Sequence, residues 1–295
     1  MWKQTVVFKI LIAVLLTWLF ARCNSNPYPS GDFYVIVISD THISRDESKV
    51  RRLIELSSLI NDDHFPGVEL LFNTGDVVSR VYGNYTETNP DTTENRLKKA
   101  VEIFRNFQIP VYLAMGNHDY KIGPDRDSDT YFPEEEIIMM ERIWEKYTGF
   151  KPYYVIQYKG WQFIVLNSMR GRFLNRNFDE KQLDWLENQL KNEIPAILLF
   201  HHPIDTDHFR LWSHPRDLIT TETEPRFFSI IRTNKHKVKG IFVGHGHRWV
   251  NDTLFEEIPV YETNSFGDEE ELMYYVVGLD NEEGSIAVSK NVMIE

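Results

Sequence analysis

Five short apolar segments of the chain each end in side chains of the types that bind metal ions. In chain order these side chains are Asp40 and His42, Asp76, Asn117 and His118, His201 or His202, and His245 and His247. Residues two apart on an extended segment point the same way, so Asp40 and His42 can contact one ion and His245 and His247 an adjacent pair. Carboxylate, imidazole and amide oxygen are ligands that suit Mn, Fe, Co, Ni or Zn rather than a thiolate site.

The number of candidate ligands indicates two metal ions that share one carboxylate, because one tetrahedral ion cannot use them all. Two ions roughly 3.5–4 Å apart activate a water and stabilise both the attacking and the leaving oxygen of an in-line displacement at phosphorus. These residues therefore predict hydrolysis of a phosphoester. The alternative is that single Asp and His residues only cap the ends of strands.

The apolar segments that carry these residues have the pattern of strands buried on both faces. They cover residues 33–39, 68–72, 111–115, 196–200 and 239–243. Segments with helical spacing of apolar residues separate the first three, which predicts parallel pairing in a layered α/β fold. We also expect helices over 134–147 and 179–191, the latter capped by Asp179, and a hairpin about Lys159 and Gly160. The stretch 81–93 is expected to be a polar loop, and 258–289 to form strands and turns.

The N-terminus has the layout of an export signal. Lys3 and Lys9 precede the apolar run 10–20, which is short for a transmembrane helix, and the only cysteine of the 295 residues, Cys23, follows it. Cys23 resembles the lipidated residue of a bacterial lipoprotein, although Arg22 stands where a small residue is usual. A cleaved signal and an uncleaved anchor are the alternatives. We expect a leader over 1–23, a flexible linker over 24–32 and the folded domain over 33–295, in an exported, membrane-tethered or periplasmic bacterial protein.

The net charge of −12 argues against nucleic acid as a partner, because sequence-independent binding to nucleic acid needs a basic surface. A small anionic substrate is compatible with this charge, since bound metal ions reverse its sign locally.

Taken together, Asp-x-His, Gly-Asp, Gly-Asn-His-Asp, His-x-Pro and Gly-His-x-His, in this order and each at a strand end, resemble the calcineurin-like metallophosphoesterase superfamily. The resemblance runs from Phe33 to the C-terminal strands. It implies a four-layer α/β/β/α sandwich, with two sheets face to face and helices outside. It also implies two divalent or trivalent ions (Mn, Fe, Zn or Co) and a metal-bound hydroxide that attacks a phosphate mono- or diester.

The resemblance assigns a role to each matching residue. One ion would be bound by Asp40, His42, Asp76 and His247, and the other by Asp76, Asn117, His201 and His245. His201 is preferred to His202 because the family's ligand stands two residues before the proline of this motif. His118 would hydrogen-bond the phosphate and protonate the leaving oxygen, and Asp119 would orient its loop.

Departures from the family pattern favour its small-molecule branch. Ser79 stands where purple acid phosphatases have a tyrosine, and the chain has Arg80 without the neighbouring aspartate and glycine of protein Ser/Thr phosphatases. The alternatives are a phosphatase or pyrophosphatase for a lipid or nucleotide headgroup, and a non-catalytic exported binding protein on the same fold.

Substrate contacts are less well defined by the sequence. Arg80 and His202 are candidates, and Arg170, Arg172 and Arg176 fall in loops that could border the site, because guanidinium groups pair with phosphate. The segment 205–221 could form a lid or be an ordinary surface excursion.

Overall fold

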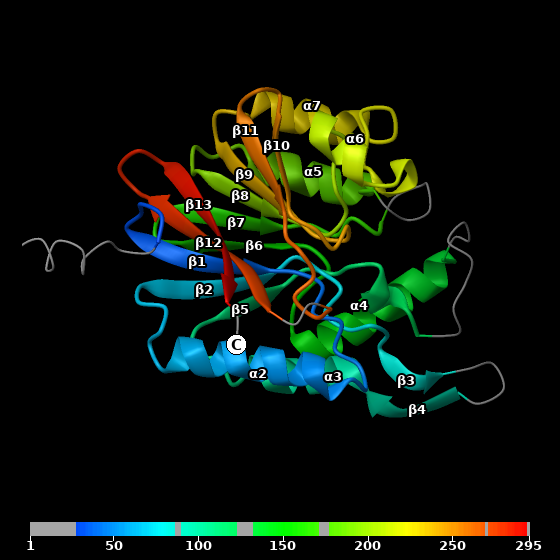
Figure 1. Ribbon diagram of the computed structural model, residues 1–295. Coiled ribbons are helices and arrows are strands. Elements are labelled where there is room, and N and C mark those ends of the chain that lie inside the picture. The colour runs from blue at the N-terminus through cyan, green and yellow to red at the C-terminus, as the bar shows by residue number, and fades with distance from the viewer. Residues whose placement is uncertain (1–27, 86–89, 123–131, 171–176, 269–270, 294–295) are drawn as a thin grey trace, which may run out of the picture.

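The computed structural model describes residues 28–85, 90–122, 132–170, 177–268 and 271–293 of the chain. Two large β-sheets pack face to face, with helices on both outer sides, and a separate two-stranded sheet lies outside them (Figure 1). The expected four-layer α/β/β/α arrangement is therefore confirmed.

The first sheet has five strands, and α2 (Glu47–Asn61), α3 (Arg96–Phe104) and α4 (Glu134–Thr148) pack on it. Its strands are β1 (Phe33–Ile38), β2 (Val68–Asn73), β5 (Val111–Leu113), β12 (Leu272–Asp280) and β13 (Ser285–Met293). The second sheet has six strands, and α5 (Glu180–Gln189), α6 (Asp207–Trp212) and α7 (Pro225–Thr233) pack on it. Its strands are β6 (Tyr154–Tyr158), β7 (Trp161–Val165), β8 (Ala196–Leu199), β9 (Val238–Val243), β10 (Val250–Leu254) and β11 (Ile258–Glu262).

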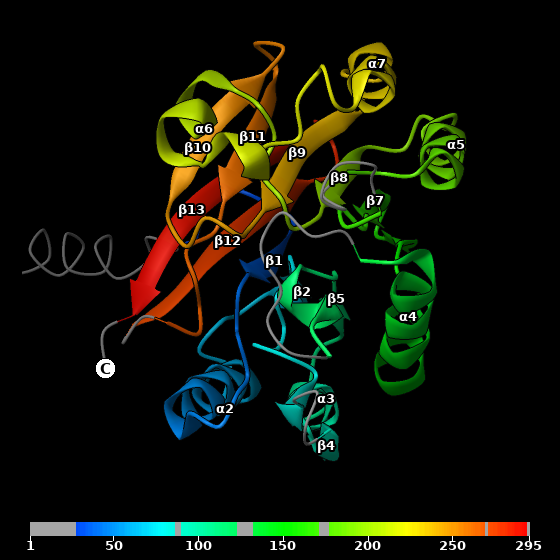
Figure 2. The ribbon, with the colours of Figure 1, turned by 90° about the vertical axis from the view of Figure 1, so that its right-hand side faces the viewer.

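Parallel pairing brings the ends of the central strands to one edge of the molecule. The strand orders are β13-β12-β1-β2-β5 and β10-β11-β9-β8-β7-β6. Strand β2 is parallel to both β1 and β5, and β8 is parallel to both β7 and β9. Figure 2 is turned toward the side on which these parallel strands end. Loops that follow them therefore meet there, where open α/β sheets usually bind ligands.

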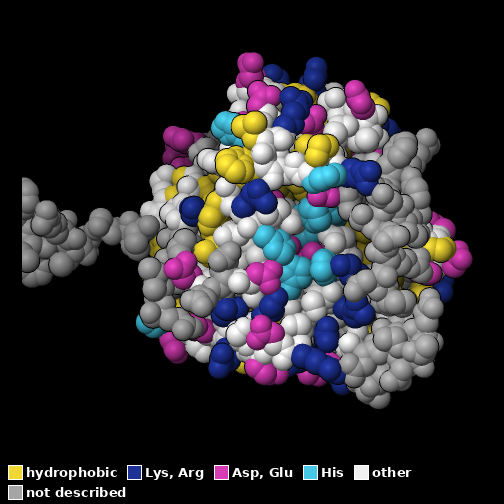
Figure 3. Space-filling model, turned by 45° about the vertical axis from the view of Figure 1, so that its right-hand side comes forward, with side chains coloured by type: hydrophobic (Ala, Val, Ile, Leu, Met, Phe, Trp, Pro, Cys, Tyr) yellow, Lys and Arg dark blue, Asp and Glu magenta, His cyan; other side chains and the backbone are white. Residues whose placement is uncertain are grey.

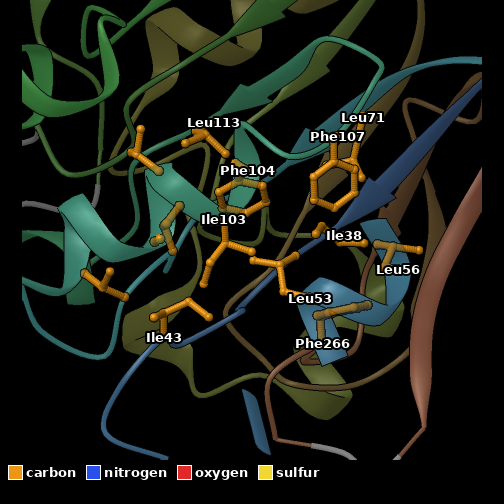
Figure 4. Packing of buried hydrophobic residues seen from close by; sticks show 14 of the residues in the cluster. Ile38, Ile43, Leu53, Leu56, Leu71, Ile103, Phe104, Phe107, Leu113 and Phe266 are labelled. Atoms are coloured by element: carbon orange, nitrogen blue, oxygen red, sulfur yellow. The ribbon is translucent and has the colours of Figure 1, made fainter. Parts of the chain in front are cut away.

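Strand β1 shows why the predicted segments are buried on both faces. Its odd residues, such as Val35, pack between the two sheets, and its even residues, such as Ile38, pack toward the helices. Figure 4 shows Ile38 in the same cluster as Leu53 of α2 and Phe104 of α3. Alternate residues of a strand point to opposite faces, so two apolar environments require a continuous apolar run.

The predicted helices end close to their expected limits because local capping residues define them. The side chain of Asp179 accepts a hydrogen bond from the backbone N–H of Gln182 at 2.7 Å, as expected of an N-cap. Helix α4 ends at Gly149, which has a left-handed φ of 80°.

The stretch 81–93 differs from the expected loop. It contains β3 (Tyr82–Tyr85) and the first part of β4 (Pro90–Asn95), which pair antiparallel. Both strands are mostly polar, so they lack the hydrophobic alternation by which a strand is recognised from sequence.

Cys23 and the rest of the leader lie outside the described residues, as do Arg172 and Arg176. Within the part of the chain that the structure describes, no helix is both long and apolar enough to cross a membrane. The domain limits at 23, 24 and 33 stay predictions.

Candidate metal centre

The predicted ligands come together where the central strands of both sheets end. They follow β1 (Asp40 and His42), β2 (Asp76), β5 (Asn117 and His118), β8 (His201 and His202) and β9 (His245 and His247). Figure 3 shows histidine side chains gathered at the centre of one face of the molecule. Residues far apart in the sequence thus form one cluster, as the strand-end pattern predicts.

One group of donor atoms comes from Asp40, His42 and His247. The Nε2 atoms of His42 and His247 are 3.1 Å apart, and Nε2 of His247 is 3.2 Å from Oδ1 of Asp40. Nε2 of His42 is 3.6 Å from the same oxygen. Oδ1 of Asp40 is buried and has no well-aligned hydrogen-bond donor among the described residues. Three donor atoms therefore face one another across a small space.

A second group comes from Asn117, His201 and His245. Oδ1 of Asn117 lies 3.1 Å from Nε2 of His201 and 3.0 Å from Nδ1 of His245. These two ring nitrogens are 3.3 Å apart. The three atoms again converge on a single point.

Asp76 lies between the two groups. Its Oδ2 is 3.2 Å from Nε2 of His201 and 3.8 Å from Nε2 of His42. Its Oδ1 accepts a hydrogen bond from the backbone N–H of His118 at 2.7 Å. One carboxylate oxygen is thus directed at both groups, while the other is held by the backbone.

These spacings fit metal ions. Donor atoms about 2.1 Å from one ion are roughly 3.0–3.4 Å apart in octahedral or tetrahedral geometry. The contacts within the second group, and the shortest contacts within the first, fall between 3.0 and 3.3 Å. The residues present can therefore hold metal, as the family resemblance implies.

Electrostatics also favour a cation here. Burial opposes protonation of His201, but Asp76 and Asp40 outweigh it and raise its pKa to about 9. Burial likewise opposes protonation of His247, yet Asp268 and Asp40 raise its pKa to about 10. The carboxylates that hold protons on these rings would equally attract a metal cation.

The backbone at the candidate ligands is strained. Positive φ angles occur at Asp40 (53°), His42 (44°), Asp76 (51°), His245 (77°) and His247 (51°). Non-glycine residues rarely adopt this left-handed region, and such strain gathers at functional sites. Five strained residues in one cluster favour a functional site over simple capping of strand ends.

Gly116 and Asp119 connect the end of β5 to the loop after β2. A Cβ atom on Gly116 would collide with the carboxylate of Asp76. The carboxylate of Asp119 accepts hydrogen bonds from the backbone N–H groups of Gly116 (2.9 Å), Val77 (3.2 Å) and Val78 (3.1 Å). Burial, with Asp76 adding to it, raises the pKa of Asp119 to about 7. These contacts fit the predicted role of Asp119 in orienting its loop.

His118 lies beside the first group of donor atoms, and its Nδ1 atom is held by a backbone carbonyl. Its ring centroid is 4.7 Å from that of His42, and its Nδ1 is 2.9 Å from the Ser79 carbonyl. Nζ of Lys121 lies 3.0 Å from its Nε2. Burial lowers the pKa of His118, Asp76 opposes this effect and Lys121 adds to it.

The candidate substrate contacts have different surroundings. His202 is buried, with Nδ1 2.8 Å from Oγ of Ser168 and its ring centroid 4.7 Å from that of His245. Arg80 is half-buried and directly follows Ser79. Arg170 instead forms ion pairs with Glu134 and Glu141 of α4.

Charged residues outside the motifs also lie beside the cluster. Lys121 contacts His118, Asp268 contacts His247, and the buried carboxylate of Glu262 accepts a hydrogen bond from the backbone N–H of Gly246 at 2.6 Å. Asp217, within the segment 205–221, lies 3.5 Å from Nε2 of His245. None stands in a strand-end motif, so only the fold reveals them.

Known proteins share both the sequence pattern and the fold. The family model described as "Calcineurin-like phosphoesterase" matches residues 33–249. A probable cyclic nucleotide phosphodiesterase of Synechococcus sp. is 26% identical over 167 residues. That match covers 56% of each chain, so this chain spans about half the length of the curated relative.

Two solved structures share the fold. A dimetal phosphatase from Danio rerio matches with a TM-score of 0.62 at 13% identity, over 90% of this chain and 98% of that chain. The inner-membrane-complex anchor GAP50 of Plasmodium matches with a TM-score of 0.52 at 11% identity, over 90% of both chains. Because an anchor protein also has this fold, the fold alone does not establish an activity.

The fold and the cluster of Asp, Asn and His residues are those expected of the metal-binding class of phosphoesterases. The chain belongs to the calcineurin-like phosphoesterase family. Membership of this family is in line with the phosphoester hydrolysis that the motifs predict.

Proposed function

We propose that the chain is a binuclear, metal-dependent hydrolase of phosphate mono- or diesters. The position of Asp76 carries this proposal, because its Oδ2 lies between the two groups of donor atoms. We assign Asp40, His42 and His247 to one ion, Asn117, His201 and His245 to the other, and Asp76 to both.

Two ions bound there would supply Lewis-acid chemistry to the phosphate and to an attacking water. The chain's own contribution centres on His118. Its Nδ1–H donates to the Ser79 carbonyl, which leaves Nε2 for the substrate; without substrate Nζ of Lys121 lies 3.0 Å from Nε2, and the phosphate would replace it there. In its protonated form, Nε2 hydrogen-bonds the phosphate and gives its proton to the leaving oxygen as the bond from phosphorus to that oxygen breaks. Water supplies the new P–O bond on the opposite side, and the proton that it loses passes to solvent, from which His118 is protonated again.

Cyclic nucleotides are the diesters to test first. The Synechococcus relative is described as a probable cyclic nucleotide phosphodiesterase, and its 26% identity supports the same substrate class for this chain. A nitrophenyl monoester and a bis-nitrophenyl diester provide the matched pair of artificial substrates.

The test uses the full-length chain, stripped of metal by chelation and reloaded separately with Mn, Zn, Fe and Co. Bound metal is counted per chain, and hydrolysis of the monoester, the bis-nitrophenyl diester and a cyclic nucleotide is compared. We expect two ions per chain and turnover that returns with metal. Binding of only one ion per chain would contradict the proposed mechanism. Binding of two ions with no turnover of any of the three substrates would also contradict it.

We also propose that the protein is exported and tethered through Cys23. The charged and apolar pattern of residues 1–20, with Cys23 directly after it, supports this. Cells expressing the full-length chain should incorporate labelled palmitate into the protein, and Cys23→Ser should abolish the label. Equal labelling of both chains, or none in the wild type, would contradict lipidation.

A further inference from the structure

The ring of His247 contacts charged groups through both of its nitrogens. Its Nε2 faces the first donor group, 3.2 Å from Oδ1 of Asp40, whereas its Nδ1 lies 3.1 Å from Oδ2 of Asp268. Asp268 follows β11 and belongs to none of the five strand-end motifs. The imidazole therefore lies between a candidate ligand and an outer carboxylate.

Asp268 is itself fixed in place. Its Oδ2 accepts a hydrogen bond from the hydroxyl of Ser265 at 3.0 Å, and its other oxygen forms an ion pair with Lys49 of α2. Its own backbone N–H donates to the hydroxyl of Ser265 at 3.2 Å. The carboxylate thus has a defined orientation even though its side chain is 37% exposed.

The segment that carries Asp268 is anchored to the end of β1. The backbone N–H of Phe266 donates to the Ser39 carbonyl, and that of Gly267 donates to the Asp40 carbonyl, each at 2.9 Å. The same short segment therefore contacts two members of the first donor group, Asp40 through its backbone and His247 through Asp268.

We propose that Asp268 is a positioning residue for His247, an inference that rests on the proposed metal function. A neutral imidazole has one N–H and one lone pair, and a carboxylate at Nδ1 selects the tautomer with its lone pair on Nε2. Outer carboxylates of this kind orient a metal-binding histidine and raise its basicity. His247 needs such an orienting contact because its side chain is 38% exposed and is therefore only partly held by packing. Its backbone is also in the left-handed region.

The two carboxylate oxygens of Asp268 contact different residues, which provides a matched control. Oδ1 pairs with Lys49, whereas Oδ2 contacts His247. Lys49→Met removes the first interaction and leaves the second. Asp268→Asn retains an oxygen that can accept from Nδ1–H but removes the charge, and Asp268→Ala removes both.

The experiment titrates metal into the stripped full-length chain and its three variants, with Zn as the probe, and measures thermal unfolding without metal in parallel. Loss of an outer partner typically costs 10–100-fold in metal affinity. We expect Asp268→Ala to weaken one of two Zn sites by about this factor, Asp268→Asn to weaken it less, and Lys49→Met to weaken it least, because the Ser265 hydroxyl still holds Oδ2 of Asp268 beside His247. In the absence of metal, the thermal unfolding midpoints of the Asp268 variants should match that of Lys49→Met, so that a loss of Zn affinity is not a loss of stability.

If both Asp268 variants bind Zn at both sites with wild-type affinity, this inference is wrong, whereas the proposed function is unaffected. Loss of affinity in Lys49→Met equal to that in Asp268→Ala would also overturn it, because the ion pair would then be the relevant contact. If the wild-type chain binds no Zn, the proposed function fails and this inference fails with it.

Discussion

The backbone N–H of His118 donates a hydrogen bond to Oδ1 of Asp76 at 2.7 Å. This contact joins the loop after β5 to the loop after β2, and it leaves Oδ2 of Asp76 as the oxygen directed at both donor groups. The carboxylate cannot rotate without losing this part-buried, charge-assisted hydrogen bond. This one interaction thus fixes the carboxylate whose other oxygen faces both donor groups.

Replacing Asp76 should therefore affect both ions. We expect Asp76→Asn to lose more than roughly 100-fold in metal affinity, exceeding the 10–100-fold loss typical of an outer partner. Metal content per chain, counted after dialysis against a fixed free concentration of Zn, is the measurement. Asp62→Asn, an exposed position at the end of α2, is the matched control. Unchanged metal content in Asp76→Asn would exclude the bridging assignment.

Replacing His118 should affect the leaving group rather than the metal. General acid catalysis typically contributes about 10²–10⁴-fold. Turnover of an alkyl phosphate should therefore fall by about this factor in His118→Ala, while turnover of a nitrophenyl ester falls much less. Metal content should stay at the wild-type value. His64→Ala, an exposed histidine before β2, is the control. Equal losses on both substrates would show that His118 does not act as the acid.

Asp119 should matter for stability. Asp119→Asn places an amide N–H₂ group against at least one of the backbone N–H groups of Gly116, Val77 and Val78, because only one of its two polar atoms accepts hydrogen bonds. A buried donor without an acceptor costs about 1–3 kcal/mol. The free energy of unfolding from urea titration of the metal-free chain is the measurement, with Asp62→Asn again as the control. A loss below the experimental error would argue against this loop-fixing role.

The strand-end residues could be predicted from sequence because each signal is local. A buried strand requires a continuous apolar run, and the polar residues that follow it, such as Asp40 after β1, are adjacent in the chain. Parallel pairing then places these ends together. The same reasoning identified the N-cap Asp179, whose contact with Gln182 spans a single helical turn.

Residues such as Asp268 and Glu262 could not be predicted, because their partners are brought to them only by the packing of β11 and its following loop against β1 and β9. Nor could the pattern show that Arg170 is paired with Glu134 and Glu141 rather than directed at a phosphate. The polar hairpin of β3 and β4 was missed for a different reason, since its strands lack an apolar face.

Metal binding should release protons, and its affinity should therefore rise with pH. Without metal, neighbouring carboxylates raise the pKa of His201 to about 9 and that of His247 to about 10, so both rings carry a proton at pH 7. A histidine ligand must be deprotonated before it binds metal. We expect Zn titrations at pH 7, repeated calorimetrically in buffers of different ionisation enthalpy, to show more than one proton released per chain. His201→Ala, which removes one of the two rings, should release fewer. Proton release near zero at pH 7, or affinity that falls between pH 6 and pH 8, would mean that these two histidines do not bind the ions.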